Sequence, residues 1–219
     1  MISNRIKTIA NLVPFEMNLA DIGSDHGYLL STLIQMNFKN SLLGVENKKG
    51  PFENLTNNIQ KIKANNIKLS FSSGLEDVDS IYNCVVIAGM GFDNIRQIIT
   101  KDINKLNNID CFIIDSHTKT KETRDFFTSL GYYIEDEKII FEDKIYYEII
   151  KFRKGESNYS YEELYFGPIL LKNESNILVN KYKDILKNNQ KITKNLSKDS
   201  LKYKSLIKIN NLIKDYLNI

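Results

Sequence analysis

Short apolar runs alternate with segments of helical periodicity along the first 150 residues of the chain. The runs predict strands at residues 18–22, 42–46, 67–72, 83–88 and 110–116, and the periodic segments predict helices at 4–13, 28–36, 51–64, 92–99 and 120–130. Strands without polar alternation are typical of a sheet that is covered on both faces. Because helices separate the strands, the order predicts right-handed crossovers and a parallel sheet.

Two further strands, at 132–141 and 145–152, follow one another with no helix between them. Glu142, Asp143 and Lys144 join them, so the pair predicts a hairpin and one antiparallel strand in the sheet. The predicted class is α/β, with a seven-stranded, mostly parallel sheet. This ending resembles the Rossmann-like class I methyltransferase arrangement, whereas an ordinary dinucleotide-binding fold ends in another crossover.

The pattern changes after residue 152. Residues 155–168 contain Gly155, several tyrosines and the pair Gly167-Pro168, and we interpret them as a linker and turn. From residue 176 onward, apolar residues recur three or four apart, with an interruption near Asp199 where Ser197 or Ser200 could cap a new helix. The simplest account of the pattern is an antiparallel hairpin of two helices. We therefore divide the chain into a domain at 1–154 and a linker with helical hairpin at 155–219.

The charge is distributed unevenly along the 219 residues. Residues 1–150 carry 16 Lys+Arg and 20 Asp+Glu, a net charge of −4, whereas residues 151–219 carry 14 and 7, a net charge of +7. A basic appendage suits a polyanionic partner such as nucleic acid, because each neutralised phosphate releases counterions. A solvated helical face in a lysine-rich protein would have the same composition.

Several classes of protein are disfavoured. The longest nearly apolar run, residues 85–92, is shorter than the roughly 20 residues of a membrane helix, and the N-terminus lacks the apolar core of a signal peptide. We expect a cytoplasmic protein that does not contact a membrane, with a monomer as the default state. Cys84 and Cys111 lie in predicted strands as core residues, and the two histidines, His26 and His117, have no metal-ligand spacing.

The first strand leads into a loop with candidate binding chemistry, Asp21-Ile-Gly-Ser-Asp-His-Gly. Gly23 and Gly27 form a G-x-x-x-G pattern, which differs from the G-x-G-x-x-G that makes room for a pyrophosphate. Asp21 and Asp25 would repel a pyrophosphate and suit an amino group or a sulfonium. A capped strand-to-helix turn with no ligand would explain the loop alone equally well.

Two other strand ends complete the pattern. Glu46 ends the second strand, 25 positions after Asp21, where an acid can accept hydrogen bonds from both ribose hydroxyls of a nucleoside; a helix cap or surface acid is the alternative. The fourth strand ends in Ala88-Gly-Met-Gly, which places bare backbone at the same edge; a tight turn is the alternative there. Together the three ends predict a nucleoside cofactor without a diphosphate, such as S-adenosylmethionine.

Residues 21–28 (DIGSDHGY) together with residues 88–91 (AGMG) resemble the bacterial tRNA adenine-N1-methyltransferase family that acts on adenine 22. Further matches, in family order, are Ser73-Gly74-Leu75, Arg124 with Phe126-Phe127, and residues 131–137, 147–150 and 166–171. The resemblance implies a class I S-adenosylmethionine-dependent fold, a C-terminal coiled coil that helps to hold tRNA, and methyl transfer to N1 of one adenine.

The resemblance also implies roles for individual residues. The implied cofactor-loop residues are Asp21, Gly23, Ser24, Asp25 and His26; Glu46 is the ribose partner; and Gly74, Leu75, Ala88, Gly89, Met90 and Gly91 are walls of the pocket. Three positions depart from the family pattern: Ser73 replaces an acid, Phe92 replaces a glycine, and residues 115–117 read Asp-Ser-His instead of Gln-Pro-Asn.

The last two departures lie on the acceptor side. Neutral adenine N1 has an in-plane lone pair, so the enzyme has to extrude and align the base and accommodate the positive charge of the product. We expect Asp115 to accept a hydrogen bond from N6, with His117 as the alternative acceptor, and Phe92 to stack on the base. Asp115 could instead cap a helix, His117 could be solvated and Phe92 could belong to the core.

Two other functions remain open at this stage. One is a methyltransferase of the same fold that acts on another base, a protein or a small molecule. The other is a tRNA-binding protein of this fold that has lost turnover, which the departures at residues 73, 92 and 115–117 suggest. A nicotinamide-dependent oxidoreductase is disfavoured by the missing middle glycine and by the predicted hairpin.

Overall fold

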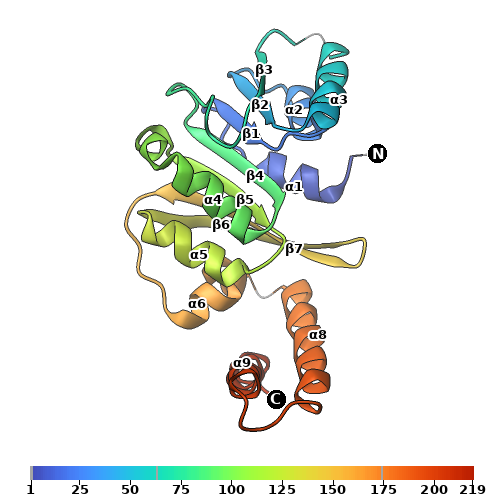
Figure 1. Cartoon of the computed structure of the whole chain (residues 1–219), viewed down its shortest axis with the longest axis vertical. Helices are drawn as coiled ribbons and strands as arrows, with labels where there is room; N and C mark the ends of the chain where they lie inside the picture. Colours follow the sequence, from blue (N-terminus) through green and yellow to red (C-terminus); the bar gives the residue numbers. More distant parts are fainter. Residues whose placement is uncertain (1, 63, 174) are drawn as a thin grey trace.

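A seven-stranded sheet forms the centre of the molecule (Figure 1), in a computed structural model that describes residues 2–62, 64–173 and 175–219. The strands are β1 (Leu19–Ile22), β2 (Leu42–Glu46), β3 (Ile67–Phe71), β4 (Cys84–Met90), β5 (Cys111–Ser116), β6 (Tyr132–Glu142) and β7 (Ile145–Lys154). Their spatial order is β3-β2-β1-β4-β5-β7-β6, and β7 runs in the direction opposite to the other six strands of the described sheet. The predicted fold class is confirmed, including its antiparallel ending.

Helices cover both faces of this sheet. They are α1 (Asn4–Leu12), α2 (Tyr28–Gln35), α3 (Lys49–Gln60), α4 (Phe92–Lys101), the 3-10 helix η1 (Ile103–Asn108) and α5 (Thr120–Ser129). Apolar residues of α1, α2 and α3 form one core with one face of the sheet, and those of α4, η1 and α5 form a second core with the other. Cys84 and Cys111 lie fully buried in the first core as free thiols, in agreement with the prediction.

The parallel register brings the carboxyl ends of three strands level. Ile22 pairs with Val45 of β2 on one side and with Ile87 of β4 on the other. The N–H groups of Gly23 and Ser24 both donate to the Val45 carbonyl at 2.9 Å, which fixes the loop after β1 against the end of β2. The loops that follow these strands therefore meet at one edge of the sheet.

The hairpin of β6 and β7 also anchors the N-terminal helix. Asp143 and Lys144 have φ values of 50° and 65°, the left-handed pair that a tight two-residue hairpin turn requires. The carboxylate of Glu142 accepts hydrogen bonds from the N–H groups of Asn4 at 2.8 Å and Arg5 at 3.1 Å. An acid at a helix N-terminus is favoured by the helix dipole, so α1 is held at the end of the hairpin.

Two sequence-based boundaries need correction. Helix α3 begins at Lys49, ahead of Pro51, and ends at Gln60 rather than near residue 64; residue 63 lies outside the described residues. The interpretation of residues 155–168 as linker and turn was wrong, because α6 (Tyr161–Phe166) lies there and α7 (Pro168–Lys172) follows at once. Ser160 and Glu163 form a reciprocal capping box at the start of α6, a local signal that the tyrosine-rich composition obscured.

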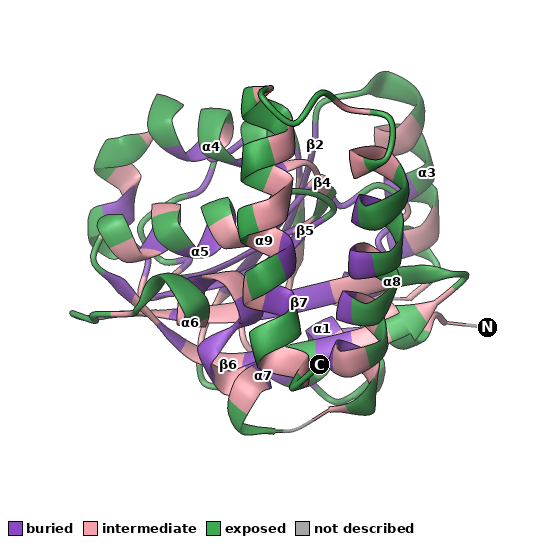
Figure 2. Cartoon of the chain, turned by 90° about the horizontal axis from the view of Figure 1, so that it is seen from below, coloured by how far each residue is buried: buried purple, intermediate pink, exposed green. Residues whose placement is uncertain are grey.

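The chain ends in α8 (Asn176–Thr193) and α9 (Leu201–Leu217). Ser200 caps α9 by accepting from the N–H of Tyr203, as expected. The Tyr182 and Tyr216 rings are 5.8 Å apart, and Asn189 donates to Asn210 at 3.0 Å, so the two helices run antiparallel. The buried side of each of these two helices packs against the other helix and against α7 and β6. The outer sides of both helices are exposed (Figure 2).

A buried charged cluster joins these helices to the sheet. The Arg124 guanidinium of α5 donates to Glu137 of β6 at 2.6 Å and to Glu148 of β7 at 2.5 Å, and none of the three side chains is more than 1% exposed. Lys181 of α8 pairs with the second oxygen of Glu148. Two cations thus balance two carboxylates in the interior, which is the condition under which buried charges are tolerated.

Candidate active site

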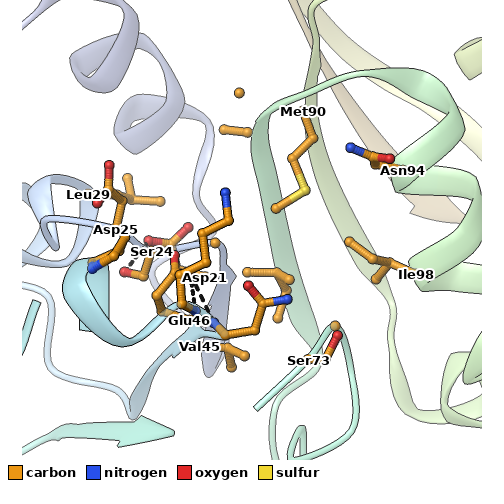
Figure 3. A pocket seen from close by; sticks show the side chains of 18 of the residues that line it. Asp21, Ser24, Asp25, Leu29, Val45, Glu46, Ser73, Met90, Asn94 and Ile98 are labelled. Carbon is orange, nitrogen blue, oxygen red and sulfur yellow. Dashed lines mark hydrogen bonds between the residues drawn. The ribbon is translucent and has the colours of Figure 1, made fainter. Parts of the chain in front are cut away.

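A cavity of about 830 Å³ opens where the carboxyl ends of β1, β2 and β4 converge (Figure 3). A volume of this size suits a ligand that is as large as a nucleoside cofactor. The predicted site residues that line it are Asp21, Gly23, Ser24, Asp25, His26, Glu46, Gly74, Ala88, Gly89, Met90, Gly91 and His117. The structure therefore brings together the three strand ends on which the sequence prediction depends.

Two glycines shape the cavity. Gly23 has a φ of +76°, a backbone conformation that favours glycine, and a Cβ at this position would lie 2.5 Å from Cε of Met90, so the flexible end of that side chain would have to move. The pairing of β4 with β5 is shifted between Ala88 and Met90, and Gly89, with a φ of +80°, lies at this bulge. Bulges of this kind re-aim a strand end next to a binding site.

Asp21 places a buried carboxylate in the cavity wall. The Ser24 hydroxyl donates to its Oδ2 at 2.7 Å. Burial raises the pKa of Asp21 to about 6, and the nearby Glu46 adds to the rise, while the Ser24 hydrogen bond and Arg5 oppose it. A buried carboxylate has lost the water that would stabilise its negative charge. A cationic ligand stabilises that charge instead, so the site favours a cation.

Glu46 is oriented by the chain that follows it. Its Oε1 accepts from the N–H groups of Asn47 and Lys48, both at 2.9 Å, and the residue is 7% exposed at the cavity wall. These two bonds hold the carboxylate in one orientation. Oε2 takes part in neither of them. A carboxylate fixed in this way can accept a hydroxyl pair without first losing side-chain freedom.

Arg5 is a site residue that the sequence analysis missed. It lines the cavity from α1, and its guanidinium carbon lies 5.1 Å from the centre of the Tyr147 ring. Its Nε forms an ion pair with Asp115 at the end of β5. Arg5 belongs to no motif and is 110 positions from its partner, so only the packing of α1 against the hairpin reveals the contact.

Three predicted site residues do not line the cavity. Asp115 is fully buried behind Arg5; burial raises its pKa, Arg5 opposes the rise, and its Oδ1 has no hydrogen-bond partner within the described residues. Phe92 starts α4 and is buried, with its ring edge-on to Phe126 at 6.0 Å, so its stacking on a base stays a prediction. Leu75 is a fully buried core residue.

His117 does reach the cavity. Its N–H donates to the Met90 carbonyl at 3.0 Å, which holds the loop after β5 against the end of β4. Its ring lies edge-on to Tyr147, 5.8 Å between centres, on the same wall as Arg5. The described residues contain no group of three or more His, Cys, Asp or Glu side chains arranged to hold a metal ion.

The sheet order, the antiparallel β7 and a cavity with acids at the ends of β1 and β2 define a class I S-adenosylmethionine-dependent methyltransferase. The sequence model of the family described as tRNA (adenine(22)-N(1))-methyltransferase matches residues 19–216. The chain belongs to this family, and its cofactor is S-adenosylmethionine.

Individual relatives agree with this assignment. The tRNA (adenine(22)-N(1))-methyltransferase of Bacillus subtilis is 26% identical over 204 residues, which cover 90% of this chain and 86% of that protein. The crystal structure of the B. subtilis enzyme superposes with a TM-score of 0.89 and covers 99% of each chain. The Mycoplasma capricolum enzyme, solved with S-adenosyl-homocysteine, is 29% identical with a TM-score of 0.89, covering 100% of this chain and 98% of that one.

Proposed function

We propose that this chain transfers the methyl group of S-adenosylmethionine to N1 of adenine 22 in tRNA. The observation that carries the proposal is the convergence of Asp21, Glu46 and Gly89 on one cavity. Family membership supplies the acceptor. None of the helices in the described ranges has the length and apolarity that a bilayer crossing requires.

The residues present fit this cofactor. The buried Asp21 offers a negative group for the methionine amino group or the sulfonium, and Glu46 offers a fixed acceptor for the ribose hydroxyls. Gly23 lines the cavity and has no side chain that would stand between its backbone and a ligand. Ser24, Asp25, His26, Gly74, Ala88 and Met90 complete this half of the cavity in our proposal.

The cofactor, when bound, supplies an electrophilic methyl group on a sulfonium. Neutral adenine N1 has its own lone pair, so no residue of this chain has to remove a proton before attack. The task of the protein is to align the base and to stabilise the charge that appears on it. The wall formed by Gly89, His117 and Arg5 is the acceptor side in this proposal, with the imidazole of His117 as the acceptor for the N6 amino group.

The structure changes the role proposed for Asp115. Because it is fully buried, it does not touch the cavity contents directly; it balances the charge of Arg5. An uncompensated guanidinium on this wall would repel the cationic methylated base, whereas the neutral pair does not. We therefore propose Asp115 as a positioning residue for Arg5, rather than as the residue that contacts the base.

The test is a methyl-transfer assay on unmodified tRNA, followed by mass mapping of the nucleosides. We expect one 1-methyladenosine, at position 22. A methyl group on another base would support the first alternative function. Binding of tRNA and cofactor with no transfer would support the second, a tRNA-binding protein without turnover.

A further inference from the structure

A groove separate from the catalytic cavity lies between α6 and α9. It has a volume of about 350 Å³, and Tyr161, Lys208 and Leu212 are among the residues that line it. Tyr161 is 50% exposed, although it is a large aromatic side chain. Neither the motif residues nor the catalytic cavity accounts for this groove.

The Tyr161 ring is held in place by its neighbours. It stacks on Tyr165 with an interplanar angle of 17° and 6.2 Å between centres. Tyr165 in turn contacts Phe166 at 5.1 Å and Tyr182 at 5.7 Å, inside the core that α6 shares with α8. The exposed ring is therefore the outer end of an aromatic stack, so its orientation is set before any partner arrives.

Two ammonium groups flank this ring. Nζ of Lys121, in the first turn of α5, lies 5.1 Å from the ring centre, and Nζ of Lys208, from α9, lies 5.8 Å from it. Residues 176–219 as a whole carry ten lysines and three aspartates, a net charge of +7. Both ammonium groups lie over the ring, as they do when a cation binds an aromatic face. An unpaired nucleotide can use this arrangement if its base takes the place of the ammonium groups on the ring while its phosphate keeps them close by.

One of the two lysines at the Tyr161 ring is close in the chain to the catalytic cavity. Helix α5 follows β5 directly, so Lys121 stands only four positions after His117, which lines the cavity. Glu162, Asn211 and Asp215 also line the groove, and their oxygens can accept hydrogen bonds from base amino groups. The carboxylates of Glu162 and Asp215 make the groove less suitable for a free phosphate than for a base.

We propose that the groove between α6 and α9 binds an unpaired nucleotide of the tRNA other than the methylated adenine, with its base on Tyr161 and its phosphate at Lys121 and Lys208. This proposal rests on the proposed tRNA substrate. At this groove, residues next to the catalytic domain and residues of the helical tail would contact the same RNA.

Three variants of the full chain test it. We expect Tyr161→Leu to raise the Kd and the KM for tRNA roughly ten-fold, with kcat nearly unchanged, because it removes the stacking surface and no catalytic group. Lys208→Met should reduce the slope of log Kd against log salt concentration by about 1. The control Lys39→Met removes an exposed lysine just before β2, at the opposite edge of the sheet, and should change neither quantity.

Calorimetric titration with S-adenosylmethionine and the melting temperature are measured on each variant. Unchanged tRNA affinity and salt slope in folded Tyr161→Leu and Lys208→Met would overturn the proposal, as would an equal loss of cofactor and tRNA affinity. If Tyr161→Leu does not fold, Lys208→Met against Lys39→Met decides the matter. Wild-type protein that binds tRNA but transfers no methyl group would instead count against the proposed function.

Discussion

At the scale of the residue, Asp21 shows a conflict between stability and binding. Its carboxylate is buried beside Glu46, and burial raises its pKa to about 6. Above that pH the ionised group lowers the stability of the free protein by roughly 3 kcal/mol, since each pKa unit corresponds to 1.36 kcal/mol. The same charge is what a cationic cofactor would neutralise.

Replacing Asp21 should therefore separate the two effects. We expect Asp21→Asn to be more stable than the wild type at pH 7.5, and the difference to disappear as the pH falls through 6 towards 4, where the native wild type takes up the proton that the unfolded chain does not hold. Denaturant unfolding across this pH range measures the difference. A variant that is less stable at pH 7.5 would contradict the assignment.

Ionised Asp21, which lowers the stability of the free protein, should raise its affinity for S-adenosylmethionine. In the wild type it should fall as the pH drops below about 6, because protonation removes the negative charge; the Asn variant should bind more weakly and lack this dependence. Calorimetry between pH 5 and 8 provides the measurement. An identical pH profile for both proteins would rule out Asp21 as the responsible group.

Glu46 allows a sharper test of the ribose contact. Glu46→Ala should weaken cofactor binding by roughly 10- to 100-fold, the usual effect of losing hydrogen bonds to a charged group. Glu46→Gln keeps an oxygen for the N–H groups of Asn47 and Lys48 and should have a smaller effect. If both variants bind the cofactor as the wild type does, the ribose assignment is wrong.

At the scale of the element, the bulge in β4 and the packing of α1 together form the acceptor wall. A Cβ on Gly89 would lie 3.0 Å from Nη2 of Arg5 and 3.6 Å from Nε2 of His117. Side chains from α1 and from the loop after β5 therefore lie next to the backbone of β4 at Gly89. The absence of a side chain at Gly89 leaves room for them.

Gly89→Ala should reduce methyl transfer more strongly than cofactor binding. The substitution forces a side chain into a backbone conformation with a φ of +80°, at a cost of about 1–2 kcal/mol, and displaces Arg5. Gly50→Ala is the matched control, because a Cβ there meets nothing within 4 Å in helix α3. Single-turnover rates measure methyl transfer, and calorimetry measures cofactor binding. If Gly89→Ala and Gly50→Ala behave alike in both measurements, the proposed role of the bulge is wrong.

The elements themselves could largely be predicted from the sequence. Short apolar runs such as residues 42–46 favour a strand covered on both faces, and β2 with its terminal Glu46 was predicted with the observed bounds. Arg5 could not be found in this way, because its role depends on a contact across 110 residues. Phe92 and Asp115 were assigned to the site from their places at strand ends and from the family resemblance, neither of which says which way a side chain points.

At the scale of the whole molecule, the helical tail is attached through charge as well as apolar contact. Lys181 reaches into the sheet to Glu148, whose side chain is 1% exposed and already shared with Arg124. Without Lys181, one cation would face the two carboxylates of Glu137 and Glu148. Removing the tail would therefore disturb the catalytic domain, so point substitutions are the better probes of its function.

Substitutions at Lys181 and Lys183 test how much this ion pair contributes to stability. Lys181→Met should lower the free energy of unfolding by about 1–3 kcal/mol, because it leaves a buried carboxylate short of a partner. Lys183→Met removes an exposed lysine two positions away and should change stability by less than about 0.5 kcal/mol. Denaturant titration of both variants provides the comparison, and similar losses would mean that the ion pair contributes little.

The capping of α1 by Glu142 has a consequence for how the enzyme comes into being. A ribosome releases the first dozen residues long before residue 142, yet the carboxylate that accepts from the first N–H groups of α1 lies on that late hairpin. Arg5 can take its place in the catalytic wall only after most of the sheet has been synthesised. A nascent chain that stops before the hairpin should thus lack one side of its active site.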